Sequence, residues 1–183
     1  VEVLKELIEM YGVSEVHISD EYERYGAARD ARVEAAGIKL VRTGSPYAVA
    51  PGRVVKPSDA TPYRVYTPFY RAWCTHGWRA PAKTPTKIPA VTPPAKYRAF
   101  PDFPMPAGVN VIAAGEKAAL ARFKEFTKKG LDSYDENRNF AAIDGTSKMS
   151  TYLKFGEIHP RTLLAGLGES KAHDTFRKEI AWR

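Results

Sequence analysis

The sequence lacks the features that mark several common classes of protein. It has a single cysteine, Cys74, so no disulfide can form within the chain, and no Cys/His cluster has the spacing of a metal site. The hydrolase motif GxSxG, the phosphate-binding motif GxxxxGK[ST] and the dinucleotide motif GxGxxG are all absent. No apolar run approaches the length of a membrane span, and no signal-peptide pattern occurs. We therefore expect a cytoplasmic protein without a bound metal ion. Because these motifs are absent, they do not indicate which reaction the protein could catalyse.

What the chain does have is a globular composition with excess positive charge. Hydrophobic residues make up 44% of the chain and charged residues 27%, which is typical of a soluble domain. The formal net charge is +7, which favours an acidic partner, and nucleic acid is the usual one. A solvated lysine-rich face would give the same charge, so composition alone leaves both interpretations open.

The first part of the sequence alternates between helical and strand patterns. Residues 3–11 have apolar side chains at helical spacing, and the β-branched segment 16–18 follows. The same order repeats with a helix at 23–36 and an apolar strand at 38–41, and each helix is followed by glycine. Strands separated by a helix pair in parallel, so residues 1–62 are expected to form the end of a doubly wound parallel α/β domain.

The middle of the chain is rich in proline. Residues 44–62 are expected to form an irregular connection, after which Thr67 and Pro68 are predicted to cap a helix that runs toward Trp78. An aromatic stripe in this helix is interpreted as core packing rather than as a ligand site; it comprises Tyr66, Phe69, Tyr70 and Trp73. Residues 80–106 contain eight prolines, which predicts an extended linker that lies along one domain. The connecting region is therefore placed at 63–113.

The remainder, residues 114–183, is predicted to be a helical domain. A first helix at 114–128 should end at Gly130 and bury one face; the residues of that face are Ala119, Leu120, Phe123 and Phe126. Further helices are expected at 147–155, at 161–167 after the His159-Pro160 pair, and at 175–183. The last pattern continues to the end of the chain, so we expect an internal fragment of a longer protein whose final helix exposes Ile180 and Trp182.

A hydroxyl-rich turn precedes one of these helices. Asp144-Gly145 is a strong turn dipeptide, and either Thr146 or Ser147 is predicted to be the helix N-cap. The first backbone N–H groups of a helix lack intrahelical partners and carry partial positive charge, so such a turn can bind a phosphate. A simple cap without a ligand explains the same residues, and the local sequence does not decide between the two.

Three segments together resemble one known family. The segment at 134–160, YDENRNFAAIDGTSKMSTYLKFGEIHP, the segment at 67–73, TPFYRAW, and the segment at 176–183, FRKEIAWR, are similar to those of the photolyase/cryptochrome family. The similarity is greatest to photolyases that repair cyclobutane pyrimidine dimers. It implies the end of an α/β antenna domain, a Pro-rich linker and the start of a helical FAD-binding domain, in a protein that is monomeric at full length and inactive as this fragment.

The resemblance also implies a set of cofactor-binding residues. Tyr134 matches a tyrosine that packs against the flavin, and Phe176 falls where relatives carry an aromatic residue, commonly tryptophan, beside FAD. Arg183 matches an arginine near the cofactor. The residues that match the turn at the FAD pyrophosphate are Thr146, Ser147, Lys148, Met149 and Ser150.

For damaged DNA, the resemblance implies that Glu179 hydrogen-bonds the pyrimidine dimer, that Trp182 stacks on it, and that Arg138 contacts a phosphate. Phe176, Glu179 and Arg183 are spaced i, i+3 and i+7, so one helix face is predicted to offer an aromatic plane, a carboxylate and a cation. Without the family, Glu179 and Arg183 would be an ordinary helix ion pair and Trp182 an ordinary core residue.

The implied chemistry is light-driven electron transfer from reduced FAD, which opens the cyclobutane ring, and it requires no catalytic residue or metal from this segment. The folate-binding relatives carry an Asn-Glu pair where this chain has Tyr25-Gly26, so the second, antenna chromophore is expected to be a deazaflavin rather than folate. Two other functions remain open: a cryptochrome photoreceptor that does not repair DNA, and a basic DNA-binding module without flavin.

Overall fold

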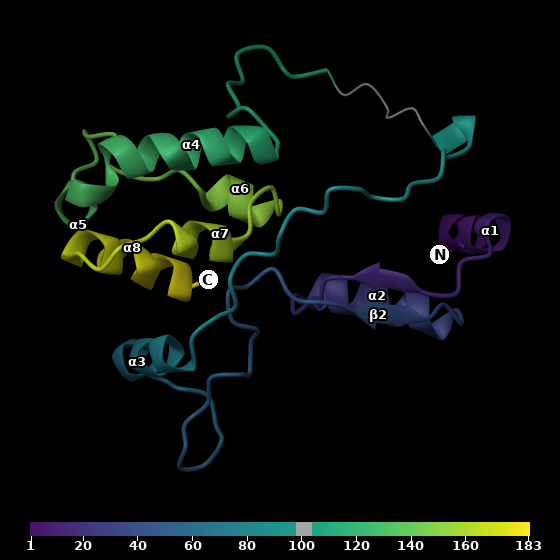
Figure 1. The fold of residues 1–183 in the computed structure, drawn as a ribbon, viewed down its shortest axis with the longest axis horizontal. Coiled ribbons are helices and arrows are strands. Elements are labelled where there is room, and N and C mark those ends of the chain that lie inside the picture. Colours follow the sequence, from purple (N-terminus) through teal and green to yellow (C-terminus); the bar gives the residue numbers. More distant parts are fainter. Residues whose placement is uncertain (98–103) are drawn as a thin grey trace.

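The computed structural model describes residues 1–97 and 104–183, and it separates an α/β part from a helical part (Figure 1). The α/β part contains α1 (Glu2–Tyr11), β1 (Val16–Ile18), α2 (Arg24–Ala35) and β2 (Leu40–Arg42). The two strands pair in parallel, with Val16 opposite Leu40 and Ile18 opposite Arg42. The predicted parallel pairing is confirmed, although the second strand begins two residues later than the sequence pattern indicated.

Glycine ends the first helix for a clear conformational reason. Gly12 has φ 61° and ψ 38°, a left-handed conformation that costs glycine little because it has no Cβ. The backbone N–H of Gly12 donates to the carbonyl of Ile8 and so satisfies one of the last helical acceptors. No residue of α1 is buried. The helix is therefore fixed mainly by its local sequence and much less by packing.

The third helix, α3 (Tyr66–His76), starts and ends slightly earlier than predicted. Val65 is its N-cap, so Thr67 and Pro68 lie within the first turn and do not cap it. Proline is tolerated there because the first N–H groups of a helix have no intrahelical partner. The helix ends at His76, before Gly77, and does not extend to Trp78.

The aromatic stripe of α3 packs in the core, as predicted. Tyr70 and Trp73 are buried, and Tyr66 and Phe69 lie at the margin of the same apolar cluster. Ala48, from the irregular segment before α3, is buried in that cluster too. The segment that follows β2 therefore packs against the helical part of the molecule.

The helical part comprises five helices and a 3-10 turn among the described residues. They are α4 (Glu116–Lys129), the 3-10 turn η2 (Leu131–Ser133), α5 (Tyr134–Asn137), α6 (Ser150–Lys154), α7 (Pro160–Ala165) and α8 (Lys171–Ala181). In Figure 1, α4 lies on one side of α8 and α3 on the other. Contacts from both sides join these layers to α8. Phe123 of α4 packs on Phe176 of α8, and the hydroxyl of Tyr70 in α3 donates a hydrogen bond to Asp174 of α8.

One core prediction for α4 is wrong. Ala119, Phe123 and Phe126 are buried, but Leu120 is 43% exposed. Each residue advances a helix by about 100°, so Leu120 lies on the flank of the face that contains the other three. There it lines a cavity together with Pro81 of the linker. The end of α4 at Gly130 is confirmed.

The last two helices begin at side-chain caps. His159 is the N-cap of α7, and its imidazole accepts from the backbone N–H of Arg161. The helix starts at Pro160, one residue before the predicted range, and ends at Ala165, two residues before the predicted end. Ser170 caps α8, so that helix begins at Lys171, four residues before the predicted start. Ile180 is 5% exposed, which overturns the expectation that it lies open at the end of the chain.

Up to residue 97, the Pro-rich linker runs from α3 toward α1 and is extended, apart from the 3-10 turn η1 (Ala95–Tyr97) (Figure 1). The hydroxyl of Tyr11 donates to the carbonyl of Thr92 at 2.9 Å, and Lys96 and Tyr97 both contact the Glu6 carboxylate. Part of the predicted linker, 98–103, lies outside the described residues. Its contacts with the α/β part are at Thr92, Lys96 and Tyr97, whereas Pro81 near its start lines a cavity with Leu120 of α4.

Candidate functional site

The hydroxyl-rich turn does not cap the helix that follows it. The N-cap of α6 is Met149, and no side chain makes the cap hydrogen bond. The prediction that Thr146 or Ser147 is the N-cap is therefore wrong. Lys148 has φ 56°, a left-handed conformation that the helix cannot include, so α6 begins only at Ser150. The Ser147 hydroxyl instead accepts from the backbone N–H of Met149 at 3.3 Å.

Two neighbouring helices fix the backbone of this turn. The Arg122 guanidinium of α4 donates to the carbonyls of Thr146 and Ser147 at 3.0 and 3.1 Å. Gly145 lies against α5, where an added Cβ would come within 2.6 Å of the Asn137 Cβ. The turn is thus held on both sides, and the side chains of Thr146 and Ser150 are exposed.

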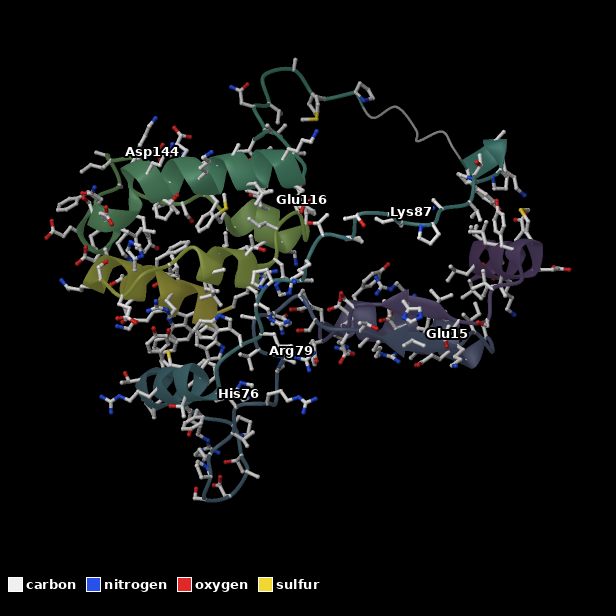
Figure 2. The ribbon with its side chains drawn as sticks, in the orientation of Figure 1. Glu15, His76, Arg79, Lys87, Glu116 and Asp144 are labelled. Carbon is white, nitrogen blue, oxygen red and sulfur yellow. The ribbon has the colours of Figure 1, made fainter. Side chains whose placement is uncertain are left out.

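The turn carries charges of both signs. The Lys148 ammonium lies 2.8 Å from the Asp144 carboxylate, and Arg122 lies 3.9 Å from the same group. The hydrogen bond from Lys148 lowers the pKa of Asp144. Figure 2 labels Asp144, which lies beside α4. An anion bound to the exposed hydroxyls would meet two cations and one carboxylate.

Tyr134 and Phe176 lie inside the protein. Their rings meet edge to face at 5.2 Å and 84°, and both contact Phe126. Burial raises the pKa of the Tyr134 hydroxyl. Phe176 is only 4% exposed, so the predicted helix face with an open aromatic plane at this position is wrong. The residue faces α4 because α8 turns its apolar side toward the core.

Arg138 and Glu179 form an ion pair between α5 and α8. The guanidinium donates to the carboxylate at 2.6 Å, and its carbon lies 5.3 Å from the centre of the Tyr134 ring. The hydrogen bond to Glu179 raises the pKa of Arg138. Both side chains are about one third exposed, so the pair lies at the surface.

Glu179 therefore pairs across two helices, whereas the alternative interpretation placed its partner at Arg183. The Arg183 guanidinium donates to the carbonyl of Leu153, at 2.6 Å, and lies 6.0 Å from the centre of the Tyr47 ring. This contact joins the end of α8 to α6, the helix that follows the hydroxyl-rich turn.

Trp182 follows α8 and is 63% exposed, which overturns the alternative that it is a core residue. Its indole stacks on the ring of Tyr66 with centroids 4.0 Å apart and planes within 4° of parallel. Both rings line an open cavity of about 370 Å³. The surface near the end of α8 thus combines an exposed flat ring at Trp182 with the carboxylate and guanidinium of the Glu179–Arg138 pair.

Positive charge gathers around a second cavity, of about 660 Å³, where the α/β part meets the helical part. Figure 2 labels two of its lining residues, His76 and Arg79, near this junction. Its other arginines are Arg42, Arg53 and Arg161. Asp20, 3.5 Å from Arg42, also lines it. The excess charge of the chain is therefore partly concentrated between the two parts.

Comparison with known proteins gives a consistent result. Residues 1–91 match the family model described as DNA photolyase. The deoxyribodipyrimidine photo-lyase of Alkalihalophilus pseudofirmus is 34% identical across 93% of this chain and 39% of its own length. The chain belongs to the DNA photolyase family. A deoxyribodipyrimidine photo-lyase of a Synechococcus strain is 31% identical, across 99% of this chain and 42% of its own length.

Solved structures extend the similarity to the whole chain. A bacterial class III photolyase from Agrobacterium tumefaciens has a TM-score of 0.75 at 28% identity and covers all of this chain. A Synechocystis cryptochrome has a TM-score of 0.67 at 18% identity, which shows a shared fold alone. The photolyase-family chain described here spans about two fifths of the length of these relatives.

The family resemblance assigned Arg138, Glu179 and Trp182 to damaged DNA, and the structure brings Arg138 and Glu179 together at the surface of α5 and α8, with Trp182 following α8. It missed Arg122, which holds the hydroxyl-rich turn, and it assigned Tyr66 to the core stripe alone. No local signal could have identified either residue, because each acts on a segment far away in the sequence.

The photolyase-family chain has no helix, within the described ranges, that is long and apolar enough to cross a membrane. Those residues also contain no cluster of His, Cys, Asp and Glu able to hold a metal ion.

Proposed function

We propose that the full-length protein containing this chain is a deoxyribodipyrimidine photo-lyase, which uses light and reduced FAD to reverse cyclobutane pyrimidine dimers in DNA. The observation that carries this proposal is the surface at the end of α8, where the exposed Trp182 ring and the Glu179 carboxylate occur together. In this proposal, residues 1–62 are the end of the doubly wound antenna domain, residues 63–113 connect the domains, and residues 114–183 begin the FAD-binding domain.

The chemistry of these side chains suits a base that has left the DNA stack. An extruded base loses its stacking and pairing partners, which an aromatic ring and polar groups of the protein can replace. Trp182 offers the ring, and Glu179 offers carboxylate oxygens that accept N–H donors at a base edge. Arg138 orients that carboxylate, and together with Arg183 it supplies positive charge toward the DNA backbone.

The residues proposed to bind FAD fit the cofactor in part. The turn fits a pyrophosphate, because Thr146 and Ser150 are exposed, and Lys148 and Arg122 supply positive charge. Ser147 and Met149 set the backbone of this turn. Tyr134 and Phe176 face one another in the interior, so they would support the flavin side of the site from beneath rather than offer an open face. Arg183 donates to the carbonyl of Leu153 and so lies next to α6, the helix that follows this turn.

FAD, when bound, supplies the one-electron photochemistry, and this chain supplies position and charge. The antenna chromophore is proposed to be a deazaflavin. This proposal rests on Tyr25 and Gly26, which occupy the positions where the folate-binding relatives carry an Asn-Glu pair. Tyr25 is exposed, and Gly26 is buried beside Glu21, where an added Cβ would lie 2.1 Å from the glutamate side chain. Fluorescence of the chromophore extracted from the full-length protein separates deazaflavin from folate.

The decisive experiment illuminates the full-length protein with reduced flavin and an oligonucleotide that carries one thymine dimer. Recovery of thymine absorbance only in blue light supports repair. Flavin without recovery would favour the cryptochrome alternative, and equal binding of damaged and undamaged DNA without flavin would favour the simple DNA-binding module. Glu179→Gln and Trp182→Ala, which remove the carboxylate charge and the ring, are expected to weaken binding of the dimer.

A further inference from the structure

Trp182 is covered on one side by another aromatic ring. The Tyr66 ring lies parallel to the indole at 4.0 Å, a separation at which two flat rings are in contact, yet most of the Trp182 side chain is exposed. One face of the indole is therefore occupied by the protein. The side chain can stack on a ligand through its other face only.

Tyr66 is itself attached to the turn of α8 that carries Trp182. The Tyr66 hydroxyl donates to the carbonyl of Lys178 at 2.7 Å, and the same carbonyl accepts the backbone N–H of Trp182 at 3.1 Å. The Tyr66 ring also stacks on Tyr70, at 5.9 Å and 22°, and packs beside Phe69. These contacts fix Tyr66 whether or not Trp182 is in place.

We infer that Tyr66 is a positioning residue, which holds Trp182 flat so that it can stack on one extruded base. The inference rests on the proposed function. A surface tryptophan that is free to rotate must be ordered when a base stacks on it, and that ordering weakens binding. Because Tyr66 holds the indole before the ligand arrives, this cost is reduced. Tyr66 acts on the lesion through Trp182.

The experiment uses the full-length protein and an oligonucleotide with one thymine dimer. Tyr66→Leu removes the ring and is expected to weaken dimer binding by roughly three- to tenfold, the range for one aromatic pair. The photorepair rate of the saturated complex should not change, because the flavin and the lesion still meet. Tyr66→Phe is the matched control, since it keeps the ring and should restore most of the affinity.

A second background tests whether Tyr66 acts through Trp182. In a Trp182→Leu protein, adding Tyr66→Leu is expected to weaken binding no further. An equal additional loss in that background would overturn the positioning role, and so would wild-type affinity in the Tyr66→Leu single variant. Thermal unfolding of each variant identifies any that fails to fold. If Tyr66→Leu does not fold, Tyr66→Met, which also removes the ring, replaces it in both backgrounds with the same expected results.

A spectroscopic measurement keeps this inference separate from the proposed function. The fluorescence of Trp182 is taken as the difference between proteins with Trp182 and with Trp182→Phe. Tyr66→Leu is expected to make this difference signal easier to quench with acrylamide, and unchanged quenching would overturn the positioning role. If the protein does not prefer dimer-bearing DNA, the proposed function fails and the quenching result alone decides how Trp182 is held.

Discussion

The α/β part and the helical part of this chain are stabilised to different degrees. The helical part, together with α3, holds a continuous aromatic and aliphatic core that includes Trp73, Phe123, Leu163 and Phe176. In the α/β part, by contrast, α1 has no buried residue and the sheet has two strands of three residues among the described positions. The comparison indicates that core packing stabilises the helical part, whereas local turns and strand pairing contribute a larger share of the stability of the α/β part.

The largest expected effect comes from the core itself. Leu163→Ala removes a fully buried side chain and is expected to lower the free energy of unfolding by about 2–5 kcal/mol. Leu7→Ala in α1, where the side chain is only partly buried, should cost less than about 1.5 kcal/mol. Chemical denaturation of the two variants measures this difference. Equal losses would show that the two parts are packed alike.

A second variant tests how tightly the hydroxyl-rich turn is held. Gly145→Ala places a Cβ within 2.6–2.8 Å of the backbone and Cβ of Asn137, so the turn must move, and we expect a loss of about 1–3 kcal/mol. FAD retention by the full-length protein should fall with it. Gly168→Ala is the matched control, because its nearest neighbour is a His173 side-chain atom at 3.4 Å. If both variants retain FAD equally, the turn does not depend on its contact with α5.

A third prediction concerns acid pH. Partial burial opposes ionisation of Asp174, but hydrogen bonds from Lys178, Tyr70 and Arg177 together hold its pKa below the ordinary value. A carboxylate with a lowered folded-state pKa stabilises the fold above its unfolded pKa of about 3.9, and this stability is lost as the pH falls through the lower folded value. Asp174→Asn should therefore reduce stability near neutral pH by about 1 kcal/mol.

The measurement for Asp174 is the unfolding free energy between about pH 7 and pH 2, compared with Asp174→Asn. The wild-type protein should lose more stability than the variant below about pH 4. Parallel curves would mean that Asp174 has an ordinary pKa in the folded state. Exposed pairs of the α/β part, such as Glu34 with Arg42, should contribute little to this acid loss.

The smallest expected effect on stability comes from the surface pair at the proposed DNA site. Arg138→Gln is expected to change the free energy of unfolding by less than about 1 kcal/mol, because the ion pair with Glu179 is partly exposed. The same change should reduce the salt dependence of DNA binding by about one counterion. Binding titrations at several salt concentrations test this, and an unchanged slope would remove Arg138 from the backbone contacts.

Much of the local structure could be predicted from sequence. Gly12, Gly130 and the His159-Pro160 pair mark helix ends that the structure confirms, because these signals depend on backbone conformations set by adjacent residues. The family resemblance likewise led to the surface at the end of α8. The starts of α6 and α8 were harder to place. The left-handed conformation of Lys148 moves the start of α6 to Ser150, and the Ser170 cap that starts α8 was not recognised in the sequence.

The sequence by itself determined the order of α/β and helical segments, the positive charge, and the three segments that resemble the photolyase/cryptochrome family. Only the tertiary structure decided that Phe176 lies in the core, that Glu179 pairs with Arg138, and that Tyr66 stacks on Trp182. The reason is physical. Caps and strand patterns depend on neighbours along the chain, whereas these contacts join distant segments and exist only after α3, α5 and α8 have packed together.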